Sequence, residues 1–159
     1  MAKAIVNDLI DQYQRTFRML AEDIGRFTPQ QWISGLSSFH KPAKLAMHIY
    51  DTLDFYSCGL PGNQYPWGYR FGGGWWELPD DRLPDQASIL AYAREIEEKL
   101  IVQLSNLTDE NLSRPYETSP EEAKTLLGHY IYALRHTLHH HGELATLAVY
   151  HGHEGGSWE

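Results

Sequence analysis

Histidines are the residues of this sequence with the clearest capacity for chemistry. The chain has nine, and four of them lie between positions 136 and 141, in the segment LRHTLHHHGEL of residues 134–144. Neutral imidazole is a common ligand of zinc and other transition metals. Only three of these histidines are consecutive, and 18 residues follow them, so a purification tag does not explain the run. A metal site and a solvated polar surface remain as interpretations.

Helical geometry separates the four histidines. Successive helical residues are rotated by about 100°, so His136 and His140 share a face one turn apart, whereas His139 and His141 point to either side of it. This face should point into the protein because its other members are mostly apolar: His129, Ala133, Leu144, Leu147 and His151. A four-residue spacing is a common way to present two imidazoles to one ion. His129, about two turns earlier, is too far away to join them easily.

His48 is the third candidate ligand. It lies in PAKLAMHIYDTLDFYSC, residues 42–58, on a helical face that it shares with Leu45, Ile49, Thr52 and Phe55. A single histidine on such a face is more often a hydrogen-bonded core residue than a ligand. Three inward-facing imidazoles on two helices are costly to bury without a shared partner. We therefore predict a metal site of His48, His136 and His140, which zinc, nickel, iron or copper would suit.

Hydrophobic periodicity predicts the elements that position these residues. Apolar residues recur every three or four positions over residues 3–26, 42–58 and 85–106, as in amphipathic helices. The segments 28–31 and 119–122 each combine a cap, a proline and an acid or amide at the third helical position. They predict a short helical turn and the start of a long helix over 119–150. With 159 residues and no predicted strand, the expected fold is one all-α domain, residues 1–159, forming a four-helix bundle.

The connection over residues 59–84 is much longer than usual and predicts a crossover loop or a functional loop. It is rich in glycine and aromatic residues, which are costly to leave in water. We expect it to pack over one end of the bundle as the lip of a pocket, although a loop that only caps the core fits the composition equally well. Residues 152–159 are expected to be a flexible tail.

Charge and composition limit the classes of partner and the cell compartment that we expect. The net charge is −8, and no cluster of lysine and arginine could neutralise a run of phosphates, so nucleic acid is not an expected partner. The single cysteine, Cys58, allows no internal disulfide and is expected to be a helix-end residue rather than a nucleophile. No stretch approaches the roughly 18 apolar residues of a membrane span, and no signal peptide is visible. A cytoplasmic protein is the resulting expectation.

Two segments resemble a known family. AKLAMHIYDTLDFY and RHTLHHHGEL are similar to the second-helix and fourth-helix segments of the DinB/YfiT-like superfamily of four-helix-bundle metalloenzymes. The resemblance implies that the family's three metal ligands fall on His48, His136 and His140. The sequence departs from the family pattern at His141, where arginine is usual, and at Glu143, where glutamine is usual. Both departures leave the ligands intact and put the substrate in doubt.

Three functions follow from such a site. Three neutral imidazoles leave an ion its full charge and an open position, as in catalytic sites. The family resemblance implies a small-molecule substrate and favours transfer of a low-molecular-weight thiol to an electrophile. A metal-dependent hydrolase is the first alternative, with Asp51 and Glu143 as candidate catalytic bases. A non-enzymatic protein that binds metal or a small ligand is the second.

A homodimer is also expected. The helix of the clustered histidines has a further apolar face, formed by Leu127, Ile131, Leu134 and Leu138. Such a face could form an interface between two copies, although a thick core in a monomer would explain it equally well.

Overall fold

The fold is a bundle of four long helices. The computed structural model describes residues 2–119 and 121–159. The long helices are α1 (Ala4–Gly25), α3 (Pro42–Cys58), α4 (Gln86–Ser105) and α6 (Leu126–Tyr150). The described residues also form three short elements: α2 (Pro29–Trp32), α5 (Asp109–Leu112) and the 3₁₀ turn η1 (Asp80–Arg82). The predicted all-α bundle is confirmed, and no strand occurs in these two ranges.

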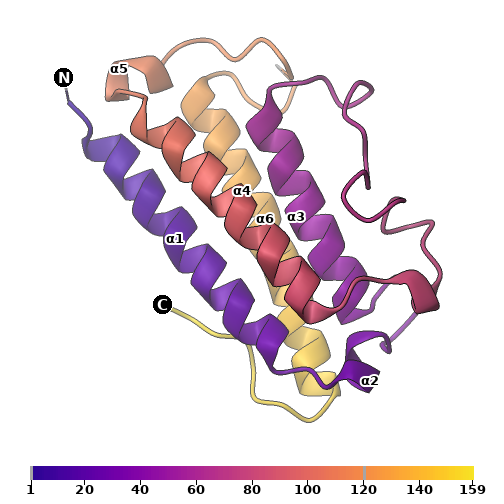
Figure 1. Ribbon diagram of the computed structural model, residues 1–159. Coiled ribbons are helices and arrows are strands. Elements are labelled where there is room, and N and C mark those ends of the chain that lie inside the picture. Colours follow the sequence, from indigo (N-terminus) through magenta and orange to yellow (C-terminus); the bar gives the residue numbers. More distant parts are fainter. Residues whose placement is uncertain (1, 120) are drawn as a thin grey trace.

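The helices form a ring in which α1 packs on α4 and α6, and α3 packs on the same two helices. Figure 1 shows α1 and α6 running in one direction and α3 and α4 in the other. Because α3 and α4 are parallel, the chain between them must return along the length of the bundle. The predicted crossover loop is therefore confirmed. The loop runs beside α3 (Figure 1). The expectation that it packs over one end of the bundle is therefore wrong.

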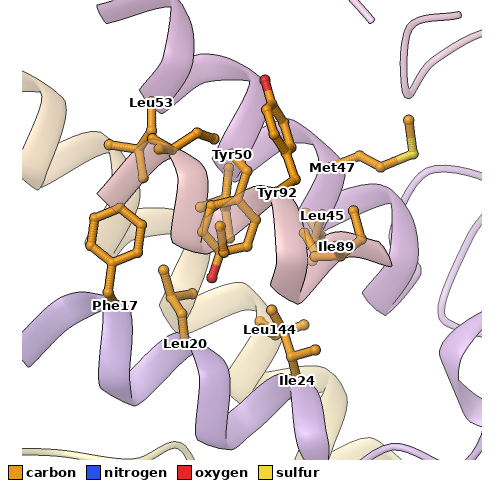
Figure 2. Close-up of a cluster of buried hydrophobic side chains, with 14 of the residues drawn as sticks. Phe17, Leu20, Ile24, Leu45, Met47, Tyr50, Leu53, Ile89, Tyr92 and Leu144 are labelled. Carbon is orange, nitrogen blue, oxygen red and sulfur yellow. The ribbon is translucent and has the colours of Figure 1, made fainter. Parts of the chain in front are cut away.

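Buried apolar side chains from all four long helices form one core. Figure 2 shows Phe17, Leu20 and Ile24 of α1 facing Tyr50 and Leu53 of α3, with Leu144 of α6 close by. The rings of Phe17 and Tyr50 stack with centroids 6.1 Å apart. Burial of each such side chain contributes roughly 1.5–3 kcal/mol, so this layer fixes the relative positions of α3 and α6.

Two buried acids of α3 hold the crossover loop against the bundle. The Tyr65 hydroxyl donates to Asp54 (2.8 Å) and to Asp51 (3.3 Å), and the backbone N–H of Gly68 donates to Asp51 (3.0 Å). Asp54 also pairs with Lys99 of α4 at 2.7 Å. Gly68 has φ +73°, and a Cβ there would lie 2.3 Å from the backbone of Gly73, so only glycine fits. The loop is thus anchored at a fixed place on α3.

The predicted start of the last helix at residues 119–122 is wrong. Helix α6 begins at Leu126, and its cap is Thr125, whose side chain accepts a hydrogen bond from the Gly128 N–H. Pro120 lies outside the described residues. Backbone pairing of the flanking segment competes with the helix, because Tyr116 N–H donates to Lys124 O and Leu126 N–H donates to Arg114 O. These bonds pair residues 114–116 with residues 124–126.

The C-terminal segment, expected to be flexible, lies against α1. The backbone N–H of Ser157 donates to Asp23 at 3.0 Å, and Arg18 forms a salt bridge with Glu159 at 2.6 Å. Trp158 is 84% exposed. These contacts bring the end of the chain to the outer side of the bundle, where Figure 1 shows the C-terminus beside α1.

Part of the apolar face expected at a dimer interface belongs to the core. Leu127 and Leu134 pack against the core cluster, whereas Ile131 is 50% exposed. The homodimer stays a prediction. Within the described residues, the helices lack the combination of length and apolar character that crossing a membrane requires.

Candidate metal centre

The three predicted ligands lie together. His48 comes from α3, and His136 and His140 come from α6, which packs against α3. Each offers one ring nitrogen, and these nitrogens all lie within 4.8 Å of one another. The ring centroids are 4.4 Å apart for His48 and His140, and 4.6 Å apart for His136 and His140. We call these three residues the histidine cluster.

The cluster lies at the edge of the bundle, not in its interior. All three histidines are half-buried, and the side chain of His140 is 17% exposed. The buried face of α6 includes the predicted residues His129, Ala133, Leu144 and Leu147, and it also extends to Thr137 and His141. His136 and His140 lie at the edge of this face, and the expectation that His140 alone of residues 139–141 points inward is wrong, because His141 is buried. This placement leaves the cluster open to small molecules.

Hydrogen-bond partners assign the protons on two of the rings. His140 Nδ1 is 2.6 Å from a carboxylate oxygen of Glu143, which can only accept, so this nitrogen carries the proton. The Thr52 hydroxyl donates to the backbone carbonyl of His48 and is 3.4 Å from His48 Nδ1. Its oxygen thus accepts from a protonated Nδ1. In both rings the assigned proton is on Nδ1, so the Nε2 lone pair is free.

The two free Nε2 lone pairs point at a common place. His48 Nε2 and His140 Nε2 are 3.0 Å apart. Two bare acceptors at this distance repel each other unless a cation lies between them. Two nitrogens bound about 2.1 Å from one tetrahedral ion are about 3.4 Å apart, which is close to the distance found. The donor set therefore fits a divalent metal ion.

Burial keeps His48 and His136 neutral. Burial, reinforced by the neighbouring histidines, lowers the pKa of His48 to about 3 and that of His136 to about 4. Both rings are therefore uncharged near neutral pH, as metal ligation requires. His136 Nδ1 is also buried and has no hydrogen-bond partner among the described residues. Such unsatisfied groups are rare in regions built for stability.

Aromatic rings border the cluster on two sides. The ring of Trp75, from the crossover loop, has its centroid 4.9 Å from that of His48. The Tyr56 ring of α3 lies 5.7 Å from the ring of His136. The loop therefore contributes to the border of the site, as the sequence suggested, although it does so from the side of α3.

The two predicted catalytic acids occupy different positions. Glu143 lies within the site, where it accepts the hydrogen bond from His140 and also lies 3.8 Å from His40 Nε2. Asp51 is buried and binds Tyr65 and Gly68 of the loop, outside the histidine cluster. Burial, with a smaller contribution from Asp54, outweighs these hydrogen bonds and raises the pKa of Asp51 to about 6. The role of either acid as a base stays a prediction.

The sequence did not reveal the partner of His141. This side chain is buried, and its Nε2 lies 2.7 Å from a carboxylate oxygen of Asp23 on α1, which is itself fully buried. The sequence pattern placed His141 beside the inward face and gave Asp23 no role. The available signal was the regular spacing of Tyr130, Thr137, His141 and Leu144 along α6, which matches a core-facing stripe.

The remaining histidines do not join the cluster. His129 is buried with its Nε2 2.9 Å from the Tyr56 carbonyl oxygen, and burial lowers its pKa. His139 is 68% exposed in its side chain and lies 3.9 Å from Glu143. Together with His140 and Glu143, His139 forms a second, more exposed group of potential ligands.

Comparison with known proteins places this geometry in a family. The model of the DinB superfamily matches residues 12–144. Searches of the curated proteins and of the solved structures gave no significant match. The matched region covers most of the chain, all of α3 and the three histidines of the cluster. On that evidence the chain belongs to the DinB superfamily.

Proposed function

We propose that the protein is a metal-dependent enzyme that transfers a small thiol to an electrophilic substrate. The observation that carries the proposal is the convergence of two free Nε2 lone pairs, 3.0 Å apart, beside a third histidine. The partial exposure of the cluster supports a catalytic site in preference to a closed structural one, because structural sites surround their ion with protein ligands. Membership of the DinB superfamily agrees with this assignment.

His48, His136 and His140 would hold the ion, and zinc and nickel are the first metals to test. A divalent ion held by three neutral imidazoles supplies Lewis acidity, which lowers the pKa of a bound thiol and keeps its sulfur nucleophilic. Glu143 accepts a hydrogen bond from the Nδ1–H of His140 and so fixes the ring with Nε2 free. Thr52 has the same role for His48.

The transfer conserves atoms and charge. The thiol releases its proton to water, and its sulfur forms a bond with the electrophilic carbon of the second substrate. The bond from that carbon to the leaving group breaks, and the leaving group departs with the electron pair. Trp75 and Tyr56, which border the cluster, would exclude water from part of this space.

The test measures metal content and turnover of the purified protein. Mass spectrometry should find a stoichiometric divalent metal, and panels of electrophiles should be consumed only when a thiol is added. Absence of both results would contradict the proposal. Hydrolysis of esters or amides without added thiol would instead favour a hydrolase, and tight metal binding without any turnover would favour a binding protein.

A further inference from the structure

Two pockets flank the histidine cluster along α6. The first, which we call the Arg135 pocket, has a volume of about 240 Å³ and is lined by Tyr132, Arg135, His136 and His139. The second, the Glu143 pocket, has a volume of about 210 Å³ and is lined by Leu36, His40, Glu143, Thr146 and Leu147. The first includes a residue of the cluster itself. A molecule in either pocket would therefore lie beside the proposed site of reaction.

The two pockets differ in charge. The Arg135 pocket contains a guanidinium, which is positive at every accessible pH. The Glu143 pocket contains a carboxylate and is otherwise lined mainly by apolar surface. An anion is therefore attracted to the first pocket and repelled by the second.

Arg135 is held in place without a carboxylate partner. Its Cζ atom lies 5.1 Å from the centroid of the Tyr132 ring, and the Tyr132 ring packs edge-on against Tyr56 at 5.6 Å. Arg15, Arg18, Arg26 and Arg70 each form a salt bridge. In the described part of the chain no salt bridge involves Arg135. Its planar donors are thus available for a carboxylate, the anion that guanidinium matches best.

We propose that the Arg135 pocket binds the carboxylate of an anionic thiol substrate. The proposal rests on the proposed function, because it identifies the chemical class of the thiol. The guanidinium fixes one end of the molecule beside His136 while the sulfur reaches the histidine cluster. A protein with a net charge of −8 repels anions in general. A local cation is what allows an anionic substrate to be selected.

Calorimetric titration of the zinc-loaded protein tests the proposal with two thiols of similar size. The anionic probe is 3-mercaptopropionate, and the neutral probe is 3-mercaptopropan-1-ol. We expect wild type to bind the anionic thiol about tenfold more tightly, since a hydrogen bond to a charged group contributes on that scale. Arg135→Gln should remove this preference, because the affinity for the anionic thiol falls to about that for the neutral thiol.

Arg94→Gln is the matched control. Arg94 is an exposed arginine of α4 that lines neither pocket, so its loss changes the net charge equally. This variant should keep the preference for the anionic thiol. The proposal is overturned if Arg135→Gln keeps the preference, or if Arg94→Gln loses it to the same extent.

A second measurement separates this proposal from thiol transfer itself. Propionate, which has no sulfur, is titrated into the metal-free protein while the ring-proton resonances of His136 and His139 are followed by NMR. A shift in wild type that is lost in Arg135→Gln supports the carboxylate site even if neither thiol binds and thiol transfer fails. Identical responses of the two proteins contradict it.

Discussion

His140 and His141 are neighbours in the chain with opposite surroundings. His141 is buried and paired with the fully buried Asp23, whose carboxylate also accepts from Ser157. His140 is partly exposed, and its Nε2 faces the Nε2 of His48. The Nε2 of His141 has a carboxylate partner within the protein, whereas the Nε2 of His140 faces only another ring nitrogen. We therefore expect substitutions at the first pair to affect stability and substitutions at the second to affect metal binding.

The largest expected effect is loss of the metal from the cluster. His48→Ala, His136→Ala and His140→Ala should each reduce metal content from about one ion per chain to nearly none, because each removes one of three protein ligands. Mass spectrometry of the purified variants measures this. His139→Ala removes an exposed neighbour and should retain the metal. Loss of metal from His139→Ala alone would move the site to the second group of potential ligands.

Disruption of the buried pair should affect stability instead of metal binding. Asp23→Ala leaves His141 buried without its partner and frees the C-terminal segment. The free energy of unfolding should fall by about 1.5–3 kcal/mol, the usual contribution of a hydrogen bond to a charged group. Urea denaturation measures the change, and metal content per folded chain should stay constant.

Asp8→Ala is the matched control for this comparison. Asp8 lies on the same helix and is exposed, and within residues 2–119 and 121–159 its side chain makes no hydrogen bond that would be lost. Its substitution should change the free energy of unfolding by less than about 0.5 kcal/mol. Equal effects of the two substitutions would mean that the Asp23–His141 pair contributes nothing specific.

A smaller effect is expected where a carboxylate orients a ligand. Glu143→Ala removes the acceptor for His140 Nδ1 and should weaken metal binding about 10- to 100-fold. Competition with a chelator measures the affinity. Glu143→Gln keeps an acceptor oxygen and should recover part of the loss. If the alanine variant binds metal as tightly as wild type, the orientation of His140 depends on packing alone.

The smallest effect concerns acid stability. Burial alone would raise the pKa of Asp23, but hydrogen bonds from His141 and Ser157 outweigh burial and hold the pKa below its ordinary value of 3.8. The ionised carboxylate therefore stabilises the fold above the unfolded-state pKa, and this contribution is lost as the pH falls through the lower folded-state pKa. Asp23→Asn should flatten the dependence of unfolding free energy on pH below about pH 4. An unchanged slope in urea titrations at several pH values would contradict this assignment.

The sequence predicted the three histidines of the cluster but not the burial of His141. The spacing of His136 and His140 and the position of His48 identified the cluster. The apolar stripe of α6 is buried as predicted, but the buried face also includes Thr137 and His141, polar side chains that add nothing to a hydrophobic pattern. The pairing with Asp23 that accompanies the burial of His141 joins residues 118 positions apart.

Capping signals in the sequence predicted helix ends correctly only where no other backbone hydrogen bonds competed with the helix. Thr28 forms the predicted capping box of α2, and α3 begins and ends at the predicted residues, Pro42 and Cys58. The equally good signal at residues 119–122 does not mark the start of α6, because Tyr116 and Leu126 donate backbone hydrogen bonds that pair residues 114–116 with residues 124–126. Such pairing depends on how α5 meets the start of α6, which no local pattern encodes.

The site has two parts that differ in how readily they tolerate sequence change. The histidine cluster is fixed by α3 and α6, whose packing depends on the core, whereas Trp75 reaches His48 from a connection tied down by Asp51 and Asp54. Connections tolerate insertion and substitution far better than packed helices do. Changes between the tether and Trp75 can therefore reshape the border of the site while the ligands of the ion stay the same.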